Sequence, residues 1–564
     1  MYTKTRFTLI TLVIVTALLA GCGQSQATRS PEFIAPAEEP QEPEAYQAPQ
    51  EAQDVAVEVT TVVEVAVEPE TFVYQEPAAA PPPAPTASPM ATAAPPADEL
   101  VPPNDEPYDD VYFEDYGVNP FIDTEDDHFS TFAVDVDTAS YTVMRRYVGD
   151  GNLPPDESVR VEEYINFFEQ GYAPPGEHQS AFAIHLDGAP SLYGEERYHL
   201  ARVGIKGYEI PSEMRKNVVL TFVIDVSGSM DMENRLDMVK ESLRMLVDQL
   251  RPSDRVGIVI YGSRARVVME HTPVGEAQHI LRAIDSLQAG GSTYAEEGLV
   301  TAYRMASAAY NPESINRVIL CSDGVANVGN TGPDAILEQV RHHAERGIYL
   351  TSVGFGMGNY NDTLMEQLAD NGDGFYAYVD TLKEAERVFV HDLTSTLQVI
   401  ARDAKIQVEF NPAVVSRYRL IGYENRDVAD EDFRNDAVDA GEVGAGHSVT
   451  ALYELKFHPE ASRSDSAMTV YVRYEDPDTG QVIETNAVMA VADFSPSFRE
   501  ASIRFQLDAV VAEYAEILRD SYWAQDSNLA DVAWEAARIA EYLPHDPDVI
   551  EFASLVERTR RISQ

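Results

Sequence analysis

The chain has few cysteines and few basic residues. Its 564 residues include two cysteines, and 41 Lys and Arg against 94 Asp and Glu give a formal net charge of -53. Nucleic acid and anionic lipid surfaces repel a field of this sign, so neither is expected as a partner, and cations or cationic partners are favoured. With so few cysteines, stability must come from packing rather than from a disulfide framework.

Several signatures of enzymes are also missing. We find no Gly-rich phosphate loop with a lysine and no Gly-x-Ser-x-Gly elbow in the sequence. His342 and His343 have too few neighbouring ligands for zinc, so we interpret them as surface residues. Cys321 follows the apolar run 317–320, which favours a buried thiol that acts as a small apolar side chain over a reactive nucleophile.

The amino terminus has the features of an export signal. Lys4 and Arg6 precede the apolar stretch 7–19, which is shorter than the ~20 residues of a spanning helix. The following Leu19-Ala20-Gly21-Cys22 resembles the lipobox of bacterial lipoprotein precursors. This resemblance implies a signal peptide at 1–21 and lipidation of Cys22. We therefore expect anchoring to the cell membrane or outer membrane, facing outside the cytoplasm.

Residues 22–118 are predicted to form a disordered linker. Seventeen of the 34 prolines lie between Pro31 and Pro107, together with many Ala and Glu, and from residue 23 to 116 Arg29 is the only basic residue. Such a composition buries too little apolar surface to offset the entropy of ordering, and Pro-rich chains run extended. The Val-rich patch 55–67 could pair as a strand, but we favour linker.

Strands and helices alternate from residue 215 to 398. Apolar runs at 218–224, 256–261, 317–321, 348–355 and 375–379 predict strands, with a further edge strand at 266–270. Helices are expected at 236–250, 277–287, 295–309, 335–346, 363–369 and 382–397. This order predicts an α/β fold with a Rossmann-like, doubly wound and mostly parallel sheet, whose ligands would sit at the carboxyl ends of the strands.

Three groups of polar residues follow strands or precede helices in this region. Asp225-x-Ser227-x-Ser229 comes directly after the first strand, Thr293 ends the Gly-Gly-Ser-Thr turn before a helix, and Asp323 is followed by Gly324 after the strand that ends at Cys321. Hard oxygen donors at alternate positions suit a small divalent cation, although the first group alone could be an ordinary polar loop.

Together the three groups strongly resemble the von Willebrand factor type A domain and its metal-ion-dependent adhesion site. The resemblance implies that Ser227, Ser229 and Thr293 coordinate the metal directly or through water, with Asp225 and Asp323 adding carboxylates. Mg²⁺ or Mn²⁺ fits this donor set, with Ca²⁺ as a third candidate. In the family one coordination position is filled by an acidic side chain of a protein partner.

The resemblance extends over about 119–560, to a bacterial family of type A domain lipoproteins. It is carried by the Pro-rich leader, by Asn119-Pro120-Phe121, and by the segments 356–362, 410–412 and 421–426. Members often have another Asp after the Asp-Gly pair, whereas Val325 and Ala326 follow here. This departure could weaken metal affinity.

The flanking regions are predicted more coarsely. We expect an N-terminal α+β region at 119–214, the type A domain at 215–398, a mainly β region at 399–496 and a helical region at 497–564. Asp135-Val136-Asp137 could bind a cation, but a strand end followed by a helix N-cap is favoured. The segment 370–374 resembles a Ca²⁺ loop, yet a tight turn explains it better because no Glu stands at its twelfth position.

Three functions are compatible with these features. The first is a membrane-anchored module that binds proteins through a divalent cation, and it is the one we favour. The second is a metal-assisted hydrolase, which would need a general base beside the metal, and no His lies near Ser227 in the sequence. The third is an envelope scaffold whose metal site is vestigial. We therefore do not expect an enzyme.

Overall fold

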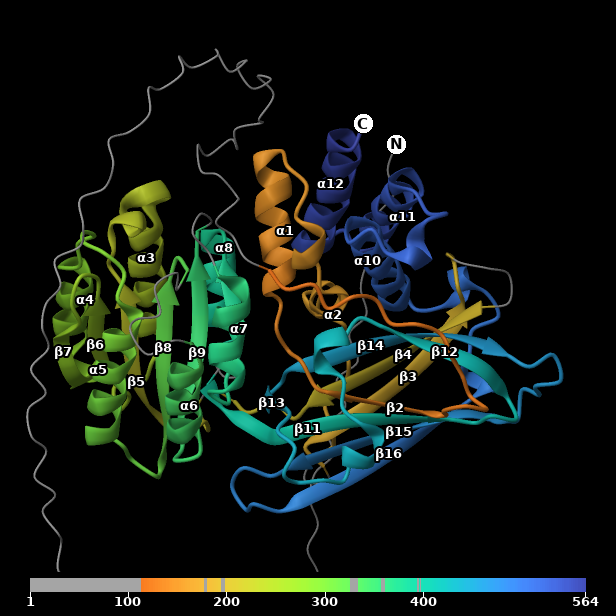
Figure 1. Cartoon of the computed structure of the whole chain (residues 1–564), viewed down its shortest axis with the longest axis horizontal. Helices are drawn as coiled ribbons and strands as arrows, with labels where there is room; N and C mark the ends of the chain where they lie inside the picture. The colour runs from red at the N-terminus through yellow and green to blue at the C-terminus, as the bar shows by residue number, and fades with distance from the viewer. Residues whose placement is uncertain are drawn as a thin grey trace, which may run out of the picture. The chain divides into compact units, whose positions relative to one another are not determined.

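A computed structural model describes residues 113–176, 180–193, 198–211, 213–324, 333–356, 361–392, 395 and 397–564. The predicted signal peptide, Cys22 and the predicted linker up to residue 112 lie outside these residues. Within the described ranges, no helix has the length and apolar character needed to cross a membrane. The described chain forms three sheets and several groups of helices (Figure 1).

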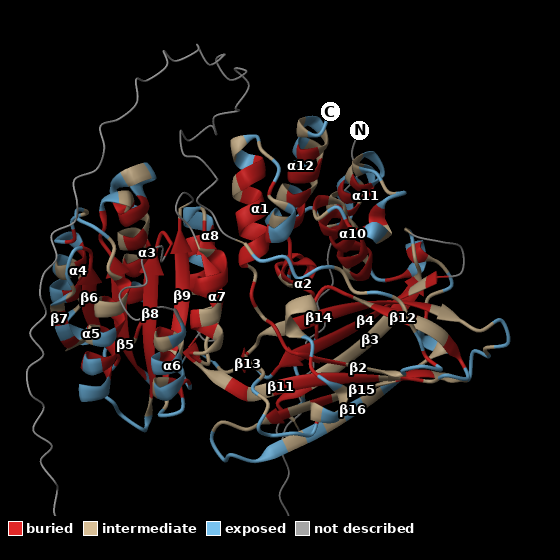
Figure 2. Ribbon diagram, viewed as in Figure 1, coloured by how far each residue is buried: buried red, intermediate tan, exposed pale blue. Residues whose placement is uncertain are grey.

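The predicted α/β fold is confirmed. One six-stranded sheet has the order β10-β9-β8-β5-β6-β7, in which only the edge strand β7 pairs antiparallel. Its strands are β5 (Asn217–Asp225), β6 (Arg255–Tyr261), β7 (Arg266–Pro273), β8 (Ser314–Ser322), β9 (Ile348–Phe355) and β10 (Tyr376–Val379). After its first residue β5 is buried throughout, which explains its continuous apolar run, since a central parallel strand is covered on both faces (Figure 2).

Helices cover both faces of this sheet. Leu220 and Ile224 point into a core with α3 (Arg235–Gln249) and α4 (Ala277–Asp285). Val223, on the opposite face of β5, packs with α5 (Ala295–Ala308), α6 (Pro333–Ala344), α7 (Asp362–Asp370) and α1 (Ala139–Asp150). The helix predicted at 382–397 is instead a short α8 (Leu382–Glu386) followed by a π-helical turn at Arg387–His391.

The two other sheets combine segments that are far apart in the sequence. One has the order β1-β12-β14-β4-β3, and the other the order β13-β11-β15-β16 with β2 also paired to β11. The strands are β1 (Ile122–Asp123), β2 (Phe129–Ala133), β3 (Phe182–Pro190), β4 (Tyr198–Gly207), β11 (Val399–Phe410), β12 (Val415–Ile421), β13 (Gly441–Gly444), β14 (Ser448–Phe457), β15 (Ser466–Glu475) and β16 (Val482–Ala490). The regions predicted at 119–214 and 399–496 therefore share both sheets, and one core between them contains Val203, Val408 and Val470.

The C-terminal helices pack against the N-terminal ones. They are α10 (Ile503–Leu518), α11 (Leu529–Tyr542) and α12 (Pro547–Ile562), and α2 spans Val161–Asn166. Their core joins Tyr141 and Phe168 to Val510 and Phe552, and the rings of Phe168 and Phe552 meet edge to face at 5.5 Å. The apolar side chains of α10 and α11, such as Val510 and Ile539, thus belong to this core.

This core gives a first test. Ile539 in α11 is fully buried, so Ile539→Val should lower the free energy of unfolding by about 1 kcal/mol, because one buried methyl group is lost. Urea unfolding followed by far-UV circular dichroism measures the change. Ile550→Val, at a position that is 44% exposed on α12, serves as the control and should be nearly neutral. Equal losses for the two variants would contradict the packing described.

Candidate metal centre

The carboxyl ends of three neighbouring strands meet at Asp225. In the parallel register Asp225 lies opposite Tyr261, the last residue of β6, and Ile224 lies opposite Cys321 of β8. Ser322, the last residue of β8, and Asp323, which follows it, are therefore brought beside Asp225. Asp225 is fully buried and Asp323 nearly so. The sheet thus places two predicted carboxylates, from positions about a hundred residues apart, at one edge.

Hydrogen bonds hold both oxygens of Asp225. Its Oδ1 accepts from the Ser227 amide at 2.7 Å, and its Oδ2 accepts from the Ser322 hydroxyl at 3.1 Å. The amide of Val226 donates to the carbonyl of Tyr261 at 2.8 Å, which fixes the start of the loop to the neighbouring strand. The carboxylate is therefore preorganised.

The two predicted serines lie side by side. The hydroxyl oxygens of Ser227 and Ser229 are 3.0 Å apart. Ser227 is buried, Ser229 is half-buried, and Gly228 between them is exposed. Two adjacent hydroxyl oxygens with one accessible side can both serve as ligands of a small cation that prefers oxygen.

The loop that carries Thr293 is tied to the serine loop by backbone bonds. The Gly290 amide donates to the Val226 carbonyl at 2.7 Å, and the Gly228 amide donates to the Gly291 carbonyl at 2.9 Å. Gly291 has a φ of +104°, a conformation that disfavours any residue with a Cβ. Thr293 is half-buried two residues before α5. The three predicted groups therefore belong to one connected set of loops.

Asp323 makes an ion pair that the sequence did not indicate. Its Oδ2 accepts a hydrogen bond from Nη1 of Arg235 at 2.9 Å, and both side chains are buried. Arg235 is the first residue of α3, the helix that follows the serine loop. Tyr261 was missed as well, although it ends the strand next to Asp225. The sequence feature that could have identified Arg235 is its place as a basic residue at the start of the helix after the serine loop.

The electrostatics of the site fit a cation. The pKa of Asp225 is raised to about 6, first by burial and then by the nearby charge of Asp323, while hydrogen bonds from Ser227 and Ser322 oppose the rise. Burial, followed by the charge of Asp225, also raises the pKa of the Tyr261 hydroxyl well above its usual value. A bound cation would relieve the repulsion between the two aspartates.

The composition of the set restricts which metals fit. In the described part of the chain, no group of three or more His, Cys, Asp or Glu side chains is arranged to hold a metal. The predicted ligand set has only two carboxylates and three hydroxyls, so it does not depend on such a group. Oxygen donors alone favour Mg²⁺, Mn²⁺ or Ca²⁺ over softer metals.

Two other segments, 135–137 and 370–374, were weaker candidates for cation sites. The N-cap position of α1 is Thr138, and no side chain makes a capping hydrogen bond there. The Oδ1 atom of Asp137 accepts from the Tyr376 amide at 2.9 Å, and the cation facing Asp135 and Asp137 is the guanidinium of Arg426. The segment 370–374 forms a tight turn, closed by a bond from the Gly374 amide to the Ala369 carbonyl.

The sequence also gave predictions for two histidines and for the two cysteines. His342 is exposed as predicted, whereas His343 is half-buried and stacks on Tyr303 with ring centroids 4.2 Å apart. Cys321 is fully buried, and burial raises the pKa of its thiol above the usual range. The interpretation of this thiol as an apolar side chain is confirmed. The predicted lipidation residue, Cys22, lies outside the described residues.

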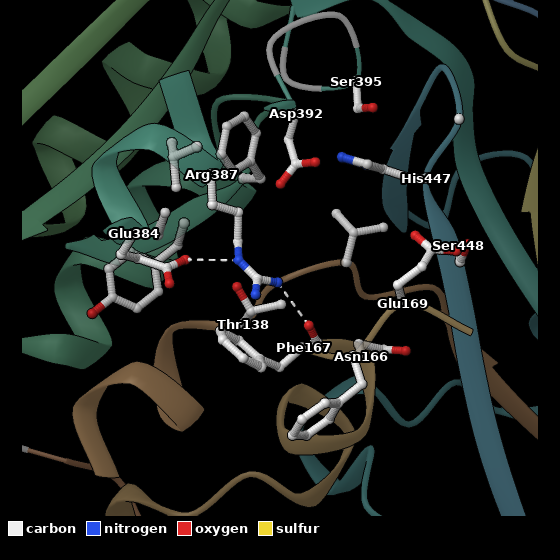
Figure 3. Close-up of a pocket in the computed structure, with 17 residues that line it drawn as sticks. Thr138, Asn166, Phe167, Glu169, Glu384, Arg387, Asp392, Ser395, His447 and Ser448 are labelled. Atoms are coloured by element: carbon white, nitrogen blue, oxygen red, sulfur yellow. Dashed lines mark hydrogen bonds and ion pairs between the residues drawn. The ribbon is translucent and has the colours of Figure 1, made fainter. Parts of the chain in front are cut away.

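A separate cavity of about 150 Å³ brings together serine, histidine and aspartate side chains (Figure 3). Ser395, His447 and Asp392 line its upper part in that view, and Arg387 crosses it to the Phe167 carbonyl at 2.8 Å. The Ser395 hydroxyl donates to the Ala445 carbonyl at 2.7 Å. Its hydrogen is therefore directed at the backbone rather than at His447, which is not the arrangement of an activated nucleophile.

Three family models match the chain. The model described as von Willebrand factor type A domain matches residues 220–393, a range that contains all five predicted metal-site residues. The chain contains a von Willebrand factor type A domain. A model described as "Uncharacterized protein YfbK, C-terminal" matches residues 395–562, and one described as von Willebrand factor matches residues 107–201.

Similar proteins include "Uncharacterized protein YfbK" of Escherichia coli strain K12, 38% identical over 359 residues, which cover 63% of this chain and 62% of that protein. "Uncharacterized protein sll0103" of Synechocystis is 25% identical over 285 residues, 50% of this chain and 67% of that protein. A solved structure, von Willebrand factor type A from Catenulispora acidiphila, is 17% identical with a TM-score of 0.40, covering 68% of this chain and 90% of that chain. The chain matches less than two thirds of the length of the Escherichia coli protein.

Proposed function

We propose that the chain is a lipid-anchored protein of the cell envelope whose type A domain binds protein partners through a divalent cation. The anchor would be Cys22, as the lipobox-like segment implies. The ligands would be Asp225, Ser227, Ser229, Thr293 and Asp323. The observation that carries the proposal is the buried pair of aspartates beside two adjacent serine hydroxyls, on loops that hydrogen bonds fix to each other.

The residues of the site would have different roles in binding the cation and the partner. Asp225 is held by Ser227 and Ser322, and Arg235 holds one oxygen of Asp323, so both carboxylates are oriented before a cation arrives. A bound Mg²⁺ or Mn²⁺ would supply a positive centre that attracts a carboxylate. Because hydroxyl ligands neutralise little of its charge, an acidic side chain of a partner completes the neutralisation.

The accessible side of the site supports a partner that approaches from outside. Gly228 and Ser292 are exposed, and Ser229 and Thr293 are half-buried, whereas Asp225 and Ser227 are buried. The two carboxylates and Ser227 therefore lie at the bottom of the site, and Ser229 and Thr293 lie nearer the surface. This arrangement leaves the coordination position on the solvent side to the partner.

We propose binding rather than catalysis at this site. Among the described residues, the side chains that hydrogen-bond to Asp225 and Asp323 include those of Ser322 and Arg235. Neither a hydroxyl nor a guanidinium is a usual general base for metal-assisted hydrolysis. The proposal therefore assigns no catalytic residue.

The test is crosslinking of the full chain in its native envelope, with Mg²⁺ or with a chelator. We expect partners that are recovered with Mg²⁺ to fall at least about tenfold with the chelator, and to fall equally in Ser229→Ala, which removes one hydroxyl ligand. Mass spectrometry of the crosslinked products measures recovery.

Ser286→Ala is the matched control, because Ser286 is an exposed serine at the end of α4 whose hydroxyl bonds only locally to the Ala283 carbonyl. It should leave recovery unchanged. Recovery of the same partners with chelator present would overturn the proposal and favour an envelope scaffold with a vestigial metal site.

A further inference from the structure

A second cleft shares no lining residue with the metal centre. It lies between the start of the described chain, strands β12, β14 and β4, and the connection from α10 to α11. Its volume is about 610 Å³. This volume is within the range of ~300–1,000 Å³ that is usual for small-molecule sites. Residues of 522–531 form one wall, and β12 and β14 contribute Arg417, Glu454 and Lys456.

Aromatic rings make up much of the lining. Phe121 packs edge to face on Trp523 with ring centroids 4.9 Å apart and lies 5.1 Å from the ring of Tyr198. The indole of Trp523 donates to the Asn119 carbonyl at 3.0 Å, so this ring is fixed. Tyr522 meets Trp523 edge to face at 4.9 Å and is 67% exposed. The cleft thus has a rigid aromatic floor and one aromatic side chain that is accessible to a ligand.

The polar lining is nearly balanced in charge. Two basic side chains, Arg417 and Lys456, stand against three acidic ones, Glu454, Asp526 and Asp531. The whole chain, by contrast, carries a formal charge of -53. A ligand of this cleft is therefore not selected by its charge. Gln525 and Asn528 add amide groups, so hydrogen-bond donors and acceptors surround the aromatic floor.

We propose that this cleft binds a short oligosaccharide. A pyranose ring presents an apolar C–H face, which can lie on an aromatic ring, and a rim of hydroxyls that both donate and accept hydrogen bonds. Both features match the lining. A proline-rich peptide, the other ligand typical of aromatic grooves, offers mainly carbonyl acceptors and few donors to the acidic and amide groups of the lining. The proposal does not depend on the metal centre.

Tryptophan fluorescence of the full chain tests it. The chain has two tryptophans, and Trp534 is 61% exposed on α11, so Trp534→Phe leaves Trp523 as the single reporter. Titration with chitotriose and with cellotriose should change its emission and saturate. Tyr522→Ala in this background should weaken binding about threefold to tenfold, because one stacking face is lost.

Tyr542→Ala is the matched control, since Tyr542 is likewise 67% exposed but does not line the cleft. It should bind both sugars as the parent does. The proposal is overturned if neither trisaccharide changes the emission up to about 10 mM, a concentration far above a useful affinity. Equal weakening by the two tyrosine variants would overturn it too, as would saturable binding of a synthetic peptide of residues 78–97 but of neither sugar.

Discussion

Asp225→Ala is expected to abolish the stabilisation of the full chain by divalent cations. In the unmutated protein, saturating Mg²⁺ or Mn²⁺ should raise Tm by about 3–5 °C, because a ligand that binds only the folded state stabilises it. The variant should show no shift, since it removes a carboxylate that lies at the bottom of the site and is bonded to Ser227 and Ser322. Differential scanning calorimetry with and without metal measures both shifts, each against its own metal-free reference.

Asp237→Ala separates this effect from a general loss of charge. Asp237 lies in the first turn of α3 with its side chain 71% exposed, so its variant should keep the full shift. If the unmutated protein is folded by circular dichroism but shows no shift with Mg²⁺, Mn²⁺ or Ca²⁺, then the metal site we propose does not exist. A shift lost equally in both variants would also argue against it.

The type A sheet could be predicted because its strands are buried on both faces. A strand such as β5 must then be apolar at nearly every position, and the polar residues at 225 and 323 stand out directly after such runs. The carboxyl ends of parallel strands lie at one edge, so the order of strands and helices was enough to expect these residues together. The sequence also indicated which loop residues would line that edge.

Pairing over long sequence distances could not be predicted. Alternation in 198–205 and 448–457 indicates two strands, but nothing in either pattern says that β4 pairs with β14 across more than two hundred residues. The same limit applies to single side chains. Asp137 has the local pattern of a helix cap, yet its carboxylate bonds to Tyr376, which lies far along the chain. Arg235 likewise meets Asp323 only in the folded chain.

Arg145→Met is expected to lower the free energy of unfolding by about 3–5 kcal/mol. The guanidinium of Arg145, in α1, makes two hydrogen bonds to Asp380, at 2.6 and 2.8 Å, and one to Glu384 at 2.8 Å. These side chains are all at least 94% buried. Methionine fills a similar volume but leaves Asp380 buried without a counter-charge, and it leaves Glu384 with only Arg387, at 3.7 Å. Urea unfolding followed by circular dichroism measures the loss.

Arg146→Met is the matched control from the next position of the same helix. Arg146 also pairs with two carboxylates, Asp150 and Glu233, but its side chain is 25% exposed, so its loss should cost below about 1 kcal/mol. Equal losses would mean that burial does not decide the effect. Arg145 also reaches Glu551 of α12 at 3.3 Å. A large difference together with a single unfolding transition would indicate that the N-terminal helix, the type A domain and the C-terminal helices unfold as one cooperative unit. The segments on either side of the type A domain would then have to fold together with it.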